Sequence, residues 1–282
     1  MHPAHPSEPF AEFREVTVTD PLRQGDVIEA VSADATHWQR LLLVLTADCD
    51  FANAKNQGRV TCVPLLQQDE YLLEFQIPRI RSRVMERLIS ELELSLQKVP
   101  HSPQISRTRL QAWPLEQGVD SVMRALNPPA ISAEGIRQLF EAVTKTAAPA
   151  NDLESAVEAL IDAQLAIPRP KSASNIRKDV LSALTAHYTS PPGDALFLSA
   201  VAPQHQDGYF AYLRHLEQVA QPAIALGPTR ASPSYRRVAR LQDRFIHAAS
   251  QQFGAVFMAI GLPSEYEEIR RLHSNLLGDR FK

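Results

Sequence analysis

The first third of the chain shows the alternation and the apolar runs of β-strands. Polar and apolar side chains alternate over residues 15–19, the pattern continues over 26–31, and the stretch 40–46 is apolar from Leu41 to Leu45. Residues 59–65 form a further β-compatible run after a loop with Asn, Lys and Gly. Short strands separated by closely spaced turn residues predict a small β-barrel. Since Leu41–Leu45 is apolar on both faces, we expect both to be covered.

The middle of the chain has the spacing of amphipathic helices. Apolar residues recur at about every fourth position between Arg83 and Val99, and again after Ser132 and after Asn151. Ser132 and Asn151 are residue types that favour the N-cap, so each is predicted to begin a helix. A further helix is predicted over residues 175–188.

The β pattern then returns and gives way to helix. Residues 195–201, 208–213 and 236–241 are short β-compatible runs between clusters of Pro, Gly and Ser. Three phenylalanines share one stripe over 245–257, which predicts a helix, and a last helix is predicted over 263–277.

This order of elements predicts an α+β protein with a small β-barrel, a long helical insertion and C-terminal helices. We expect residues 1–75 and 193–242 to form the barrel domain, 76–192 the insertion and 243–282 a helical cap. Two consecutive α+β domains are the alternative. The insertion is favoured because four early strands need the later strands as partners.

Composition narrows the class of protein. With 282 residues, 44% of them hydrophobic, the chain can bury a sizeable core. Its 29 basic and 32 acidic residues give a formal net charge of -3, which provides no general attraction to nucleic acid or to an anionic membrane.

Location follows from what the sequence lacks. No apolar run approaches the roughly 20 residues that cross a bilayer. Residues 1–9 lack the basic cluster and apolar stretch of a secretory signal. We therefore expect a cytoplasmic protein with no membrane segment, in which Cys49 and Cys62 are free thiols.

Three short motifs follow one another in the first quarter of the chain. Gly25-Asp26-Val27 precedes the stretch from Arg40 to Thr46, which in turn precedes Val63-Pro64-Leu65. Over residues 22–66 this order resembles the MazF/PemK-like toxin barrel, a small SH3-like fold.

The resemblance implies a possible activity. RNA cleavage in that family relies on an arginine and a Ser or Thr hydroxyl, so the resemblance implies Arg40 as charge stabiliser or acid and Thr46 as a phosphate contact. The chain departs from the family pattern in having Leu41 after the arginine, where a proline is usual, and in its long helical segment. From the residues alone, Arg40 could instead pair with a carboxylate such as Asp26, and Thr46 suits a β-strand.

The triplet Asp48-Cys49-Asp50 allows several interpretations. In the structural one, Cys49 is a small buried hydrophobe and the aspartates accept hydrogen bonds from nearby backbone N–H groups. Alternatively, Cys49 and Cys62 bind zinc together with His37 or a carboxylate. Cys49 could also be a reactive thiol, although flanking carboxylates raise its pKa. Finally, the aspartates could bind a ligand.

A basic cluster near the end of the second β region is a candidate binding surface. Arg236, Arg237 and Arg240 lie between Tyr235 and Phe245, and arginines with aromatic neighbours can contact phosphates and stack on bases. On a regular strand Arg236 and Arg240 would face one way and Arg237 the other. Ion pairs or a solvated face are the alternative.

Together these features favour a bacterial regulatory or interaction protein of the stress, toxin–antitoxin or phage-defence kind. We expect it to bind another macromolecule through the barrel and helices, with a protein as the expected partner and RNA as the alternative. The bacterial and defence parts follow from the resemblance. A metal-independent endoribonuclease and a zinc-supported binding module are the competing hypotheses, and the leading hypothesis needs no cofactor.

Overall fold

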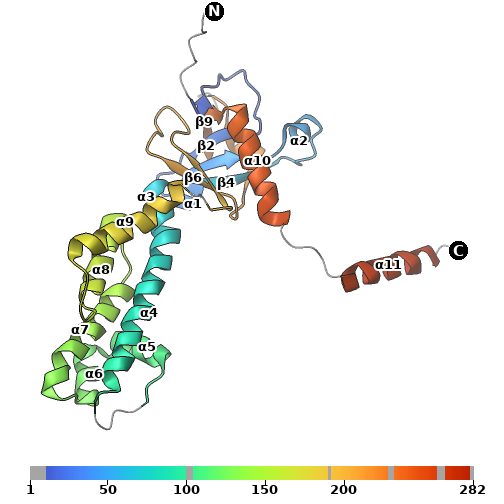
Figure 1. Ribbon diagram of the computed structural model, residues 1–282. Coiled ribbons are helices and arrows are strands. Elements are labelled where there is room, and N and C mark those ends of the chain that lie inside the picture. The colour runs from blue at the N-terminus through green and yellow to red at the C-terminus, as the bar shows by residue number, and fades with distance from the viewer. Residues whose placement is uncertain (1–10, 100–103, 190–191, 228–231, 259–263, 280–282) are drawn as a thin grey trace, which may run out of the picture. The chain divides into compact units, whose positions relative to one another are not determined.

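The chain forms two compact units (Figure 1). The sheet unit comprises residues 1–65, 192–206 and 211–282, and the helical unit comprises 66–191 and 207–210. The computed structural model describes residues 11–99, 104–189, 192–227, 232–258 and 264–279. Residues 1–9, in which no secretory signal is predicted, lie outside this described part.

The described strands belong to one sheet with the order β1-β9-β2-β3-β4-β6-β5, while β7 also pairs with β4 and β8 with β9. Their bounds are β1 (Phe13–Arg14), β2 (Asp26–Ala30), β3 (Leu41–Val44), β4 (Arg59–Gln67), β5 (Ala195–Leu198), β6 (Tyr209–Tyr212), β7 (Glu217–Ala220), β8 (Ile224–Ala225) and β9 (Tyr235–Leu241).

One segment links the two ends of the strand path β9-β2-β3-β4. Strand β7 pairs antiparallel with β4, the 3₁₀ turn η2 (Gln221–Ala223) follows, and β8 pairs parallel with β9. Because of this return, the largely antiparallel sheet curls into a half-barrel. The prediction of an α+β fold is confirmed.

The strands expected near 26–31, 40–46 and 59–65 are confirmed, with one correction at Arg40. Arg40 ends the short helix α1 (His37–Arg40) instead of opening β3, since its backbone N–H donates to Thr36 O at 2.8 Å. The strand expected over 15–19 is wrong, because the side chain of Asp20 accepts a hydrogen bond from Thr17 N at 2.7 Å and closes a turn.

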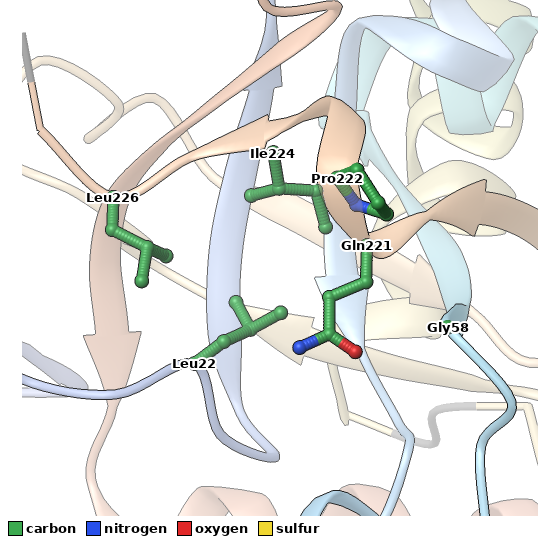
Figure 2. Close-up of a pocket in the computed structure, with 6 residues that line it drawn as sticks. All are labelled: Leu22, Gly58, Gln221, Pro222, Ile224 and Leu226. Carbon is green, nitrogen blue, oxygen red and sulfur yellow. The ribbon is translucent and has the colours of Figure 1, made fainter. Parts of the chain in front are cut away.

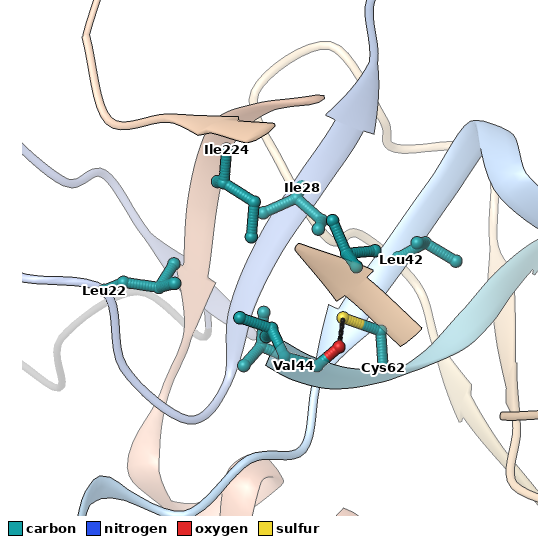
Figure 3. Close-up of a cluster of buried hydrophobic side chains, with 8 residues drawn as sticks. Leu22, Ile28, Leu42, Val44, Cys62 and Ile224 are labelled. Atoms are coloured by element: carbon teal, nitrogen blue, oxygen red, sulfur yellow. Dashed lines mark hydrogen bonds between the residues drawn. The ribbon is translucent and has the colours of Figure 1, made fainter. Parts of the chain in front are cut away.

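The core of the sheet unit lies inside the curl (Figure 3). Its side chains come from β2, β3, β4, β7, β8 and the loop before β2, and all are shielded from water. They are Leu22, Ile28, Leu42, Val44, Val60, Cys62, Val219 and Ile224. Strands that cover one another in this way bury the apolar side chains of β3.

The helical unit contains α3 (Gln68–Tyr71), the π-helix η1 (Leu72–Gln76), α4 (Ile77–Leu96), α5 (Arg107–Gln117), α6 (Val119–Leu126), α7 (Ala130–Ala147), α8 (Leu153–Leu165) and α9 (Ala173–Thr189). Helix α4 packs against α7 and α8, and α8 against α9. Leu88, Leu92, Leu139 and Phe140 are among the fully buried side chains. The sequence placed the insertion at 76–192, and the unit defined by contacts starts ten residues earlier.

The predicted helix starts need two corrections. Helix α7 begins two residues before Ser132, after Pro129, and the Ser132 hydroxyl donates to Pro129 O instead of capping. Helix α8 is capped by Asp152 and not by Asn151, because the Asp152 carboxylate accepts from Ser155 N at 2.7 Å.

Two helices follow the last strand, in the segment expected to be a helical cap. They are α10 (Asp243–Met258) and α11 (Ser264–Asp279). The Gln252 amide donates to Ala195 O at 3.0 Å, and Gln24 donates to the Ser250 hydroxyl at 3.2 Å, so α10 is fixed to the sheet unit. In the described part of the chain no helix is long and apolar enough to cross a membrane.

Candidate functional site

The sheet unit carries a polar groove of about 650 Å³. The groove is built where β3 ends and β4 begins, with contributions from helix α2 (Asp48–Ala52), the loop after it, β7 and α10. Its lining residues are Leu45, Thr46, Ala47, Asp50, Lys55, Asn56, Gln57, Arg59, Thr61, Gln218 and Phe253. Two residues predicted from sequence, Thr46 and Asp50, are therefore brought together here.

The loop between α2 and β4 adopts an unusual backbone. Ala54 and Gln57 have positive φ angles of 52° and 49°, a region that side chains disfavour. Asn56 stabilises the loop, since its Nδ2 donates to Arg59 O at 3.1 Å and to Gln221 Oε1 at 2.8 Å. Strained backbone of this kind persists only where its surroundings enforce it.

Two cations, Lys55 of this loop and Arg59 at the start of β4, are available to a ligand. Lys55 and Arg59 are both exposed and line the groove. Within the described residues neither side chain makes an ion pair or a hydrogen bond. Asp50 is the one carboxylate among the described lining residues, so the groove carries more positive than negative charge.

Thr46 is engaged in strand pairing. It is 8% exposed, and its Oγ1 accepts a hydrogen bond from Thr61 N at 2.7 Å. Its own N–H donates to Thr61 O at 3.2 Å. The hydroxyl thus extends the β3–β4 pairing beyond the end of β3.

Arg40 lies outside the groove. It is exposed at the opposite end of β3 from Thr46, and the four residues of that strand span roughly 13 Å at about 3.3 Å per residue. The structure therefore does not bring the two residues expected of a ribonuclease into one site.

The triplet 48–50 forms the first turn of α2. Asp48 Oδ1 accepts from Gln24 N at 2.9 Å, which is the structural role expected for an aspartate here. Cys49 is exposed, so its predicted burial is wrong. Asp50 faces the groove.

The two cysteines have opposite environments. Cys62 is buried in the core, where its Sγ lies 3.8 Å from Val60 O (dashed line in Figure 3). Burial raises the pKa of the Cys62 thiol well above its usual range, and the nearby Glu217 raises it further. Within the described residues no group of three or more His, Cys, Asp or Glu could hold a metal ion, so nothing in the geometry favours the zinc hypothesis.

The three arginines of β9 are all paired with carboxylates of β2. Arg236 Nη2 lies 2.7 Å from Glu29 Oε2 near the surface. Arg240 Nε lies 2.6 Å from Asp26 Oδ1, and Arg237 Nη1 lies 3.4 Å from Asp26 Oδ2, with all three side chains buried. These arginines support the ion-pair interpretation and do not line the groove.

A β-bulge corrects the expected facing of these arginines. Asp26 pairs with Arg240 and Ile28 with Arg237, so Val238 is an extra residue in β9. Residues 26 and 28 share a face of β2, and their partners therefore share it too. Arg237 and Arg240 lie on one face, whereas the regular-strand expectation put them on opposite faces.

An apolar surface continues from the groove along α10. The rings of Phe253 and Phe257 are 5.1 Å apart, and Phe253 lines the groove. Phe257 is 56% exposed and Met258 is 81% exposed. Large apolar side chains exposed together mark interaction sites more often than isolated ones.

The chain matches no protein-family profile, no curated protein and no solved structure. Its candidate site is therefore defined by its own geometry. Sequence reasoning missed Lys55, Arg59 and Phe253, because single residues on a loop, at a strand start and in a helix form no motif. The one signal available was the Asn-Ala-Lys-Asn-Gln-Gly loop, whose composition marks a turn.

Proposed function

We propose that this chain is a non-catalytic interaction protein whose sheet unit binds a segment of a partner protein in the groove. The observation that carries the proposal is the pair of cations without partners in the described structure, Lys55 and Arg59, next to the aromatic Phe253. A segment with a carboxylate beside apolar side chains would complement these groups.

A non-catalytic role fits the position of the expected catalytic residues. Arg40 lies outside the groove, and the Thr46 hydroxyl accepts a backbone hydrogen bond. A ribonuclease needs its charge stabiliser and its phosphate contact around one scissile bond. The chain's own residues therefore favour binding over cleavage.

A protein fits the groove better than RNA. Asp50 offsets one of the two cations, and the neighbouring surface of α10 is apolar. RNA binding relies on several phosphate contacts and a basic face, and the chain as a whole has a net charge of -3.

The architecture and the resemblance supply the rest of the proposal. The return of β7, η2 and β8 from β4 to β9 supports an SH3-like barrel. The order of features over residues 22–66 resembles the MazF/PemK-like toxin barrel, and on that resemblance alone we propose a bacterial stress, toxin–antitoxin or phage-defence setting.

A photo-crosslinking residue at Gln57 tests the proposal directly. Irradiation in cells of the source organism should give a discrete protein–protein product that is lost in the double variant Lys55→Glu/Arg59→Glu. The matched control Arg83→Glu/Lys178→Glu changes the same charge at exposed positions of the helical unit and should retain the product. Equal loss in both double variants would contradict recognition in the groove.

Native mass spectrometry with a short mixed-sequence RNA separates the alternatives. We expect intact, unbound RNA at physiological salt. RNA that is shortened by the parent chain but stays intact with the Arg40→Ala variant would restore the ribonuclease hypothesis. A salt-sensitive complex with intact RNA would make the partner a nucleic acid.

A further inference from the structure

The sheet unit has a second cavity, of about 300 Å³, beside the turn that returns the chain from β4 to β9 (Figure 2). It is lined by Leu22, Gly58, Gln221, Pro222, Ile224 and Leu226. None of these residues lines the groove proposed to bind a partner.

The floor of this pocket is the core of the sheet unit itself. Leu22 and Ile224 belong to the buried cluster inside the curled sheet, and Leu226 packs against that cluster. The pocket is therefore the place where the apolar interior of the half-barrel reaches the surface. A preformed apolar wall of this kind favours apolar ligands, whose desolvation costs little free energy.

Gln221 supplies the one polar side chain among the described lining residues. Its Oε1 accepts a hydrogen bond from Asn56 Nδ2 at 2.8 Å. The same Asn56 atom bonds to Arg59 O, and because a carbonyl oxygen only accepts, this atom is the amide nitrogen of Asn56. The other end of the Gln221 amide is therefore Nε2, drawn on the side of Leu22 in Figure 2. Within the described residues Nε2 has no hydrogen-bond acceptor.

We propose that this pocket binds a small, uncharged and largely apolar molecule that carries one hydrogen-bond acceptor, with Gln221 Nε2 as the donor. The volume is at the lower end of small-molecule sites, about 300–1,000 Å³, which limits the ligand to about one ring or one branched chain. A charged ligand is disfavoured because none of the described lining residues has a charged side chain to offset its desolvation.

Acetophenone and isopropylbenzene are probes that test the apolar contacts and the hydrogen bond of this proposal separately. They have similar shapes, but only acetophenone has a carbonyl acceptor. In the full chain with ¹³C-labelled methyl groups, both should shift the NMR signals of Leu22, Ile224 and Leu226. Acetophenone should bind about tenfold more tightly, as expected for one added hydrogen bond.

The variant Gln221→Leu should bind both probes with equal affinity, whereas Gln206→Leu, which changes an exposed glutamine outside the pocket, should keep the tenfold preference. Leu226→Trp fills the pocket and should abolish the shifts from both probes. Dispersed methyl signals verify the fold of each variant.

Three results with these two probes would overturn the proposal. They are the absence of shifts at these methyl groups in the parent chain, equal affinity of the parent chain for both probes, and a preference that persists in Gln221→Leu. Tighter binding of the peptide Gly-Phe-Gly than of acetophenone would assign the pocket to a peptide side chain and overturn the small-molecule assignment.

Discussion

Asp26 connects strands that lie far apart in the sequence. Its buried carboxylate accepts hydrogen bonds from Arg240 and from Arg23 N, the latter at 2.8 Å. Both arginines also donate to backbone oxygens, Arg240 Nη2 to Pro21 O at 2.7 Å and Arg237 Nη2 to Thr17 O at 2.7 Å, while Arg237 Nε is buried without a hydrogen-bond partner among the described residues. The loop before β2 is thus fastened to β9 by a cluster with one more positive than negative charge.

Replacing this carboxylate should strongly destabilise the chain. In Asp26→Asn two buried guanidinium groups lose their counter-charge, so we expect the free energy of unfolding to fall by about 3–5 kcal/mol. Urea denaturation followed by tryptophan fluorescence measures the change. A loss below about 1 kcal/mol would mean that the two guanidinium groups become hydrated in the variant.

The control is the neighbouring exposed pair. Arg236 is 60% exposed at its side chain and bonds to Glu29. Surface ion pairs contribute about 0–1 kcal/mol, so Arg236→Gln should be nearly neutral in the same assay.

The Asp26 cluster also shows a limit of sequence reading at the residue scale. Arg237 and Arg240 are three positions apart, a spacing that a regular strand places on opposite faces. Only the extra residue Val238 brings them together, and a bulge depends on how the partner strand is paired. The partner β2 is roughly 210 positions away.

At the scale of elements, the π-helix η1 joins α3 to α4 within the helical unit. Gln76, its last residue, is 2% exposed, and its Nε2 has no hydrogen-bond partner among the described residues. An unpaired buried donor costs free energy, and short π-helical turns are often found at functional sites.

Removing this donor should stabilise the protein. Gln76→Met keeps the length of the side chain and buries no unpaired amide, so we expect the free energy of unfolding to rise by about 1 kcal/mol. The exposed Gln97→Met is the matched control and should change it by less than about 0.5 kcal/mol. A drop in chemical denaturation midpoint for Gln76→Met would show that the amide is satisfied, for instance by water.

Elements were predicted well wherever side-chain burial sets the pattern. The apolar run of β3 and the phenylalanine stripe of α10 both fall in the predicted elements. Element ends were less predictable. Ser132 and Asn151 are wrongly placed because a helix start depends on which backbone N–H finds an acceptor, and several neighbouring residues can supply one. Arg40 is wrongly placed because its own N–H bonds to Thr36 O and ends the short helix before β3.

At the scale of the whole molecule, each of the two units has buried apolar side chains of its own. In the helical unit these come mainly from α4, α7 and α8. Tyr71 and Phe210, which both belong to this unit, stack with ring centroids 4.1 Å apart.

We therefore expect residues 66–191 to fold when expressed alone. The fragment should show a helical circular dichroism spectrum and a cooperative thermal transition, at a lower temperature than in the full chain because it lacks Phe210. The full chain is the reference in the same buffer. A broad, non-cooperative loss of signal would show that the helices depend on the rest of the molecule.

The candidate groove could not be predicted because it forms only when distant segments of the chain come together on folding. Thr46 and Asp50 were singled out from a local pattern, whereas Gln218 and Phe253 come from β7 and α10, late in the chain. No local spacing relates these positions, and the loop that carries Lys55 owes its shape to left-handed backbone at Ala54 and Gln57.

The pairing of β2 with β9 also imposes an order in time during protein synthesis. Strand β4 is complete at Gln67, but β9 begins about 170 residues later, at Tyr235. At roughly 5–20 residues per second, a ribosome needs about 8–34 seconds to make the intervening chain. During that interval the helices of residues 66–191 leave the ribosome while β2 still has an unpaired edge. Nascent chains are therefore most exposed to aggregation just before translation reaches β9.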